Sequence, residues 1–414
     1  MKNTAHPLEP KADKDTVRRH NLSLVLRAVR DEGEATRAAV AARVGLTRAA
    51  VSSLVEQLLA GGFLTEQGKT FSGQAGRPGT ALRVARSGPA GLGVEINIDY
   101  VAVCVVDLAG TDRVRLTEHV DNRGVAPAEV LERAARIAAR TLGSAAEQDL
   151  RPAGARLALP GLVSGGTVRQ APNLGWNQVA AETLFARALA QCPGRPALPV
   201  GSDNEANAAA LAELWFGVGA GPEPVRGFLY LTGEIGVGGA VVVDGELLRG
   251  AHGFAGEIGH AMADADGPRC RCGSRGCLEQ YAGQAALLRG AGLDETAGMP
   301  GVAELERRAR AGDARTVAAL ERAGRMLGLV VSGAVNLLDP EAVVLGGIYR
   351  PLMPWLGPAA DRELTLRVVS GLWPAGSGRL RASSSSGDAA RGAAAAVVRE
   401  VVANPAGYAV RAPT

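Results

Sequence analysis

Long apolar runs, lysine and cysteine are all scarce in this chain of 414 residues. No stretch reaches the roughly 18 consecutive apolar residues that a membrane-spanning helix needs. The first twenty residues are charged and contain no apolar core of a secretion signal. These absences predict a protein without a membrane partner that stays in the cytoplasm. Internal repeats with a period of about 20–50 residues are also absent, which argues against a solenoid.

Lysine accounts for only 4 of the 45 basic residues, and this skew toward arginine is by itself a weak indicator of nucleic-acid binding. The net charge of +3 conceals an uneven distribution. Residues 1–90 contain 14 Lys and Arg against 8 Asp and Glu, a net charge of +6, whereas residues 91–414 carry a net charge of −3. The basic character therefore belongs to the front of the chain.

Three short helices are predicted after a flexible leader over residues 1–17. Apolar periodicity and threonine caps place these helices at residues 22–29, 36–44 and 47–59. Gly45 provides a tight turn between the second and third helices, and strands over 63–66 and 81–84 form a wing. This order predicts a winged helix-turn-helix DNA-binding domain over residues 18–88. A small helical domain whose third helix merely packs is the alternative.

The first turn of the third helix is the part of such a domain that enters the major groove. Its candidates for base and phosphate contacts are Thr47, Arg48, Ser52 and Ser53. In the wing, Arg77 stands between glycine and proline and suits a narrow A·T-rich minor groove, with a plain surface turn as the alternative. The expected partner is a double-stranded DNA operator, bound by a homodimer or a dimer of dimers because helix-turn-helix dimers match two-fold DNA.

Three of the five cysteines stand close together, ten residues after a histidine. One imidazole and three thiolates can close a tetrahedral zinc site with no position left for water, so the metal would be structural. The predicted ligands are His260, Cys270, Cys272 and Cys277. Three reduced cysteines placed together by chance are the alternative. A structural Zn²⁺ would also fix the nearby Glu257 and whatever that residue binds.

Strands alternate with helices from Gly91 onward, which predicts an α/β layered fold. Predicted strands lie at 91–96, 101–106, 113–120 and 155–159, and a helix lies at 127–142. Nine glycines fall between Gly233 and Gly259. This density predicts tight turns and backbone held close to ligands.

Three segments resemble motifs of the repressor/open-reading-frame/kinase (ROK) family. Glu-Ile-Gly-His at 257–260, followed by Cys-x-Cys-Gly-x-x-Gly-Cys-Leu-Glu at 270–279, resembles the family signature. Asp-Asn-Glu-Ala-Asn at 203–207 resembles a second motif in the form found in xylose-repressor relatives. Val-Val-Leu-Gly-Gly at 343–347 resembles the diglycine on the nucleotide side. The resemblance extends over about residues 20–400.

The resemblance implies an actin-like, two-lobed sugar-kinase fold behind the winged helix. Lobe 1 is expected over residues 90–200, completed by a C-terminal helix at about 385–405, and lobe 2 with the zinc site over 201–384. The residues expected to bind sugar hydroxyls are Asn204, Glu205, Glu257, His260 and Glu279. Asn173 is a further candidate, with a solvated loop as the alternative, and Trp176 lies either beside the sugar or in the core.

Three departures from the kinases of the family favour a regulator over an enzyme. Those kinases carry an Asp-x-Gly-Gly-Thr loop for ATP phosphates, where this chain has Glu-Ile-Asn-Ile-Asp-Tyr at 95–100, with a branched Ile98 and an acidic Asp99. Glu205 replaces the aspartate base and would be misplaced for in-line transfer. Glu234 adds a carboxylate at a second phosphate position. We therefore expect a non-enzymatic, sugar-responsive repressor of carbohydrate-use genes; an active ATP-dependent sugar kinase with a DNA-binding domain is the alternative.

Overall fold

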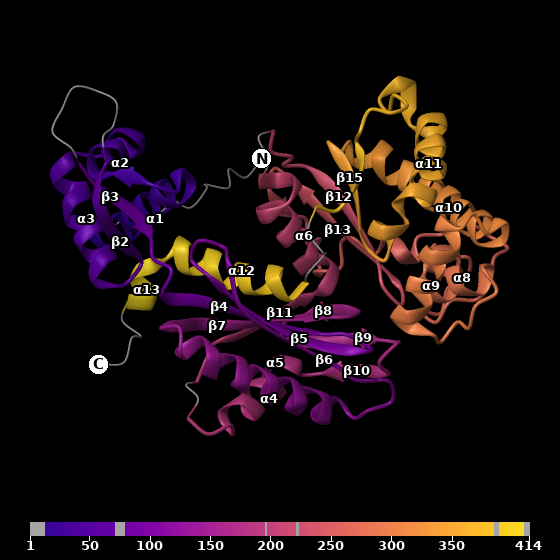
Figure 1. Cartoon of the computed structure of the whole chain (residues 1–414), viewed down its shortest axis with the longest axis horizontal. Helices are drawn as coiled ribbons and strands as arrows, with labels where there is room; N and C mark the ends of the chain where they lie inside the picture. The colour runs from indigo at the N-terminus through magenta and orange to yellow at the C-terminus, as the bar shows by residue number, and fades with distance from the viewer. Residues whose placement is uncertain (1–12, 71–78, 195–196, 221–222, 385–388, 410–414) are drawn as a thin grey trace, which may run out of the picture.

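The N-terminal part of the chain folds as a winged helix-turn-helix, as its sequence predicts. The computed structural model describes residues 13–70, 79–194, 197–220, 223–384 and 389–409. The first helices are α1 (Lys14–Glu32), α2 (Arg37–Val44) and α3 (Arg48–Ala60). Strands β1 (Ala35–Thr36), β2 (Leu64–Thr70) and β3 (Gly79–Val84) form an antiparallel sheet in the order β1-β3-β2. This module stands at the left of Figure 1.

Side-chain caps define where these helices begin. Thr36 and Thr47 accept hydrogen bonds from the N–H groups three residues ahead, as N-cap residues do. Asp13 caps α1 in the same way, so residues 14–17 are helical and the prediction of a flexible leader to residue 17 is wrong there. Apolar periodicity could not detect this first turn because its side chains are exposed. Residues 1–12 of that predicted leader lie outside the described residues.

Gly45 turns the chain between α2 and α3 in a left-handed conformation, with φ 70° and ψ 24°. The two helices are bent by 114° relative to each other. Within the described residues no single helix is long and apolar enough to cross a membrane, and only this bent pair passes that test as a combination.

Lobe 1 is a five-stranded mixed sheet with the order β11-β7-β4-β5-β6. Its strands are β4 (Gly88–Ile96), β5 (Tyr100–Asp107), β6 (Asp112–His119), β7 (Leu150–Leu159) and β11 (Val200–Asn204). Short turns make β4, β5 and β6 antiparallel, whereas β7 and β11 run parallel because helices precede them. Those helices are α4 (Pro127–Ala146) and α5 (Ala181–Ala190), and a small sheet of β8 (Leu162–Ser164), β9 (Thr167–Ala171) and β10 (Trp176–Val179) lies between them in sequence.

Lobe 2 repeats the same strand pattern with the order β14-β13-β12-β15-β16. Its strands are β12 (Phe228–Gly233), β13 (Val237–Val243), β14 (Glu246–Leu247), β15 (Ala342–Gly347) and β16 (Leu380–Ala382). Its helices are α7 (Glu279–Ala282), α8 (Gln284–Gly290), α9 (Gly298–Arg310), α10 (Ala314–Leu338) and α11 (Tyr349–Arg367). Two sheets of one design, each a three-strand meander followed by two parallel strands, confirm the predicted two-lobed actin-like architecture.

Two helices connect the parts of the molecule. Helix α6 (Glu205–Phe216) follows β11 and packs against β13 of lobe 2, while α12 (Ala389–Ala403) returns to pack on β4, β5 and β7 of lobe 1. The predicted C-terminal closing helix is therefore present. The predicted start of lobe 2 at residue 201 is wrong, because β11 pairs with β7 inside the lobe 1 sheet. That pairing is long-range and leaves no mark in the local sequence.

The winged helix shares a buried core with lobe 1. Only residues 85–87 separate β3 from β4, and the predicted domain end at residue 88 already lies within β4. One apolar cluster contains Val25 of α1, Cys104 of β5 and Val398 of α12, all 0–4% exposed. The last helix, α13 (Pro405–Ala409), also packs on α1. In Figure 1, α12 extends in yellow across lobe 1 toward the winged helix.

Candidate functional site

A cleft between the two lobes gathers the residues predicted to bind a sugar. Its walls come from the β4–β5 hairpin, the β9–β10 loop and the start of α6 on one side, and from the β12–β13 hairpin and the cysteine loop on the other. All six predicted residues line it: Asn173, Asn204, Glu205, Glu257, His260 and Glu279. The structure therefore brings the whole predicted set together, although their role as ligands stays a prediction.

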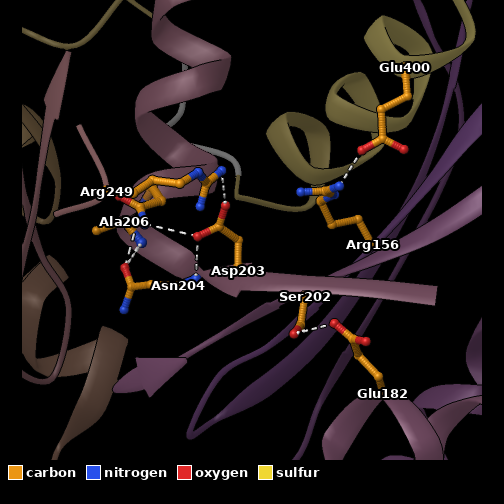
Figure 2. A network of polar contacts seen from close by, with 9 residues as sticks. Arg156, Glu182, Ser202, Asp203, Asn204, Ala206, Arg249 and Glu400 are labelled. Atoms are coloured by element: carbon orange, nitrogen blue, oxygen red, sulfur yellow. Dashed lines mark hydrogen bonds and ion pairs between the residues drawn. The ribbon is translucent and has the colours of Figure 1, made fainter. Parts of the chain in front are cut away.

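Asn204 and Asp203 hold the start of α6 against the cleft (Figure 2). Asn204 Oδ1 accepts the N–H of Ala206 at 2.7 Å, and its Nδ2 donates to the Gly161 carbonyl at 2.9 Å and to Glu205 at 3.0 Å. Both amide hydrogens of Asn204 are thus engaged. A direct bond from Asn204 to a sugar hydroxyl would have to replace one of these contacts.

Asp203 joins the two lobes behind this pocket wall. It is 4% exposed, and its carboxylate accepts a hydrogen bond from the Asn204 N–H at 2.9 Å. Its other oxygen accepts from Arg249 of lobe 2 at 2.8 Å (Figure 2). The loop after β14 is therefore tied to the end of β11, so the orientation of Glu205 depends on both lobes.

Carboxylates dominate the electrostatics of the cleft. Burial raises the pKa of Glu205 well above its ordinary value, and the neighbouring carboxylates of Glu257 and Glu234 raise it further. Burial likewise raises the pKa of Glu234 to about 8, with contributions from Glu95 and Asp99. Near pH 7 Glu234 is consequently mostly protonated and can donate a hydrogen bond.

Glu234 occupies space beside the diglycine of β15. A Cβ added to Gly347 would lie 3.0 Å from Glu234 Oε1. Since the carboxyl is mostly protonated at neutral pH, it occupies this space mainly as a neutral group.

Replacing Glu234 by Gln is expected to stabilise the protein more at pH 8 than at pH 5. The folded state keeps its proton up to about pH 8, whereas an unfolded carboxyl releases it near 4.5, so the wild type loses stability as the pH rises between those values. Glutamine cannot ionise and removes this loss. Thermal unfolding of both proteins across that range measures the difference, and a constant gap between the two melting temperatures would contradict the assignment.

The hairpin between β4 and β5 is closed by its own hydrogen bonds. The Asn97 N–H donates to the Tyr100 carbonyl at 2.9 Å, and the Ile98 N–H donates to the Asn97 side chain at 2.7 Å. The Tyr100 hydroxyl donates to the buried Glu95 carboxylate at 2.5 Å. Two backbone N–H groups that a phosphate-binding loop would leave free are thus already occupied.

The predicted metal ligands form one cluster beside the cleft. The ligand atoms of His260, Cys270, Cys272 and Cys277 all lie within 4.8 Å of one another. The Cys270 sulfur lies 3.8 Å from His260 Nδ1, and the Cys272 and Cys277 sulfurs are 3.7 Å apart. Atoms bound to one tetrahedral metal ion at about 2.0–2.3 Å have comparable separations. The cluster can therefore hold a metal ion, and its thiolate-rich donor set suits Zn²⁺.

The sequence model of the ROK family matches residues 91–400, about three quarters of the chain. The chain belongs to the ROK family. It is 29% identical to the xylose repressor of Caldicellulosiruptor bescii over 341 residues, which cover 79% of this chain and 82% of that repressor.

Two solved structures, one of a regulator and one of a kinase, have folds similar to that of this ROK chain. A ROK family transcriptional regulator, described as a homologue of the Escherichia coli Mlc protein, is 22% identical with a TM-score of 0.76, covering 96% of this chain and all of its own. A ROK glucokinase from Streptomyces griseus, in complex with glucose and AMPPNP, is 26% identical with a TM-score of 0.61, covering 74% of this chain and 98% of its own.

Arg271 is a cleft residue of this ROK chain that the sequence did not predict. Arg271 lines the cleft and donates to the Asn173 side chain at 3.1 Å, linking the cysteine loop of lobe 2 to the β9–β10 loop of lobe 1. Its position between two predicted metal ligands could have identified it. Trp176, left open by the sequence, is 2% exposed and belongs to the core of lobe 1.

The glycine-rich stretch of the ROK domain serves packing more than ligand contact. Only Gly236, Gly238 and Gly239 line the cleft. A Cβ at Gly239 would lie 2.6 Å from the Gly256 carbonyl oxygen, and a Cβ at Gly259 would overlap that of Val237. Gly239, Gly256 and Gly259 therefore let the segment before the cysteine loop pack closely against β13, which positions Glu257 and His260.

The predicted DNA contacts lie on one accessible end of α3. Thr47, Arg48 and Ser53 are exposed, and Ser52 is half-buried. The opposite face of α3 is buried through Val51 and neighbouring apolar residues. Arg77 lies outside the described residues. The exposure of this helix end is compatible with entry into a DNA groove, and the contacts themselves stay a prediction.

Proposed function

We propose that this protein is a transcriptional repressor that binds a double-stranded DNA operator and releases it when a sugar occupies the cleft between its lobes. The buried core shared by the winged helix and lobe 1 carries the proposal, because a DNA-reading module is joined to a sugar-kinase fold without a flexible linker. The xylose repressor to which the chain is related along most of its length supports the same function.

The ligand in this proposal is an unphosphorylated sugar. Glu205, Glu257, His260 and Glu279 would bond its hydroxyls, with Asn173 contributing from the β9–β10 loop and Asn204 orienting Glu205. Carboxyl and amide groups suit this task because each can accept or donate several hydrogen bonds. In the same proposal a structural Zn²⁺ on His260 and the three cysteines fixes the wall that carries Glu279.

Phosphoryl transfer is not part of the proposed function. The N–H groups of the 97–98 turn are already bonded, Glu234 occupies the space beside Gly347, and Glu205 stands where the family's kinases have an aspartate base. An active sugar kinase is the second candidate function, and the similarity to a glucokinase structure that holds glucose and AMPPNP favours it.

We further propose that the repressor acts as a homodimer or dimer of dimers on a two-fold operator.

One set of measurements separates the two candidates. Full-length protein selects its operator from random DNA, and fluorescence anisotropy then follows operator binding with a panel of pentoses and hexoses. At least one sugar is expected to weaken operator binding by about 5–150-fold, without ADP formation in the presence of MgATP. ADP release at about 1 s⁻¹ or faster would favour the kinase, and sugars that bind without changing operator affinity would contradict the repressor.

A further inference from the structure

Helix α12 contacts both the elements that form one wall of the cleft and the DNA-binding domain. It packs on β4, whose hairpin lines the cleft, on α6, which starts at Glu205, and on α1 of the winged helix. The helix has 15 residues and so extends over about 22 Å at 1.5 Å per residue. One rigid element therefore spans the region between the cleft and the DNA-binding domain.

Glycines bring α12 into backbone contact with two elements of one cleft wall, β4 and α6. A Cβ at Gly93 of β4 would overlap the Ala390 carbonyl oxygen, and one at Gly91 would overlap that of Ala394. A Cβ at Gly392 of α12 itself would overlap the Ala208 carbonyl oxygen of α6. Because these contacts have no intervening side chains, α12 can move relative to β4 and α6 only a little before the packing changes. Packed interiors shift between discrete arrangements and do not deform smoothly.

Glu95 fixes the N-terminal end of α12 to the cleft hairpin. Its Oε2 accepts the Ala390 N–H at 3.2 Å, and its Oε1 accepts the Tyr100 hydroxyl at 2.5 Å. The carboxylate is 5% exposed and does not line the cleft, whereas Asn97 and Ile98 of the same hairpin do. Movement of the hairpin would thus displace α12 through Glu95.

The C-terminal half of α12 is buried against the DNA-binding domain. Val398, Val401 and Val402 are at most 4% exposed and share one cluster with the apolar face of α1 and with Phe63 before β2. Helix α13 extends the same contact along α1. A displacement of α12 therefore changes the packing that holds the winged helix.

We propose that α12 transmits sugar binding to the DNA-binding domain and that Glu95 is the positioning residue that couples this helix to the cleft. The inference rests on the proposed function, because it assigns a path to a response that the proposal requires. Glu95 touches neither sugar nor DNA in this scheme. Its loss should therefore leave both affinities intact and remove only the link between them.

The test is the ratio of operator dissociation constants with and without saturating sugar, measured for wild type, Glu95→Gln and Tyr100→Phe. Glutamine keeps the shape of Glu95 but has one acceptor oxygen for two donors and no charge. We expect a wild-type ratio of about 5–150 to fall below 3 in Glu95→Gln and to an intermediate value in Tyr100→Phe. Sugar affinity without DNA, measured by calorimetry, should change less than threefold.

Glu118→Gln is the matched control, because Glu118 lies on β6 of the same lobe, pairs with Arg140 and is not part of the α12 contact. It should keep the wild-type ratio. Unchanged ratios in both Glu95→Gln and Tyr100→Phe would overturn the role of α12 while leaving the proposed function standing. A wild-type ratio of one with every bound sugar would overturn the proposed function and this inference together. Tyr100→Phe decides the question alone if Glu95→Gln does not fold.

Discussion

Replacing Cys277 by Ser is expected to remove the metal ion and to abolish sugar binding. Cys277 is fully buried, and the loop around it has few apolar contacts of its own that could keep it folded. Because metal binding to such a cluster contributes folding free energy directly, at apparent values of about 10–16 kcal/mol in isolated zinc fingers, the loss should exceed that of an ordinary core substitution.

Sugar binding should disappear with the metal because the same loop forms one wall of the cleft. His260, Arg271 and Glu279 all line that wall. Metal content by mass spectrometry, thermal unfolding and calorimetry with the sugar measure the three effects. Cys192→Ser is the control, since this cysteine is half-buried between α4 and α5, outside the cluster. A Cys277→Ser protein that lacks metal but melts and binds sugar like wild type would contradict the structural role.

Replacing Arg48 by Ala is expected to weaken operator binding by about 5–150-fold, the range of 1–3 kcal/mol for one arginine contact to a guanine. Arg48 is the first residue of α3 and is exposed. Stability should change little, because no hydrogen bond or ion pair joins its guanidinium to another of the described residues. Arg367→Ala, a change to an exposed arginine of lobe 2 paired with Glu363, should leave operator binding unchanged.

The salt dependence of operator binding distinguishes the two kinds of contact that Arg48 could make. Loss of a phosphate contact lowers affinity for all sequences and reduces the salt slope by about one, whereas loss of a base contact relaxes the preference at one position. Wild-type affinity and specificity in Arg48→Ala would remove α3 from the proposed interface.

Local signals explain why the bounds of α2 and α3 could be predicted to within one residue. Thr36 and Thr47 each accept an N–H three residues ahead, and the Gly45 N–H donates to a carbonyl four residues back, so the sequence neighbourhood of each contains the relevant interaction. The start of α1 was missed because its first turn has no buried face. Its cap, Asp13, is a polar residue among other polar residues, and only the hydrogen bond to Thr16 reveals its role.

The lobes and the cleft required more than local signals. Motif resemblance brought the six sugar candidates together, but the end of lobe 1 was misplaced because the β11 pairing with β7 joins distant residues. The protonation of Glu234 follows from burial and from Glu95 and Asp99, which are remote in sequence. The contact of Arg271 with Asn173 could not be predicted, because the two residues are 98 positions apart in the sequence.

The three-residue connection between β3 and β4, together with the common core beneath it, has a consequence for the DNA. Because the winged helix is packed on lobe 1 in this way, α3 has a fixed orientation and position relative to the rest of the protein. In a symmetric pair, each inserted base pair moves the second half-site by about 3.4 Å and rotates it by about 34–36°. If the protein acts as the homodimer proposed above, we expect it to bind operators of one half-site spacing, so that this distance selects its target genes as strictly as the base sequence does.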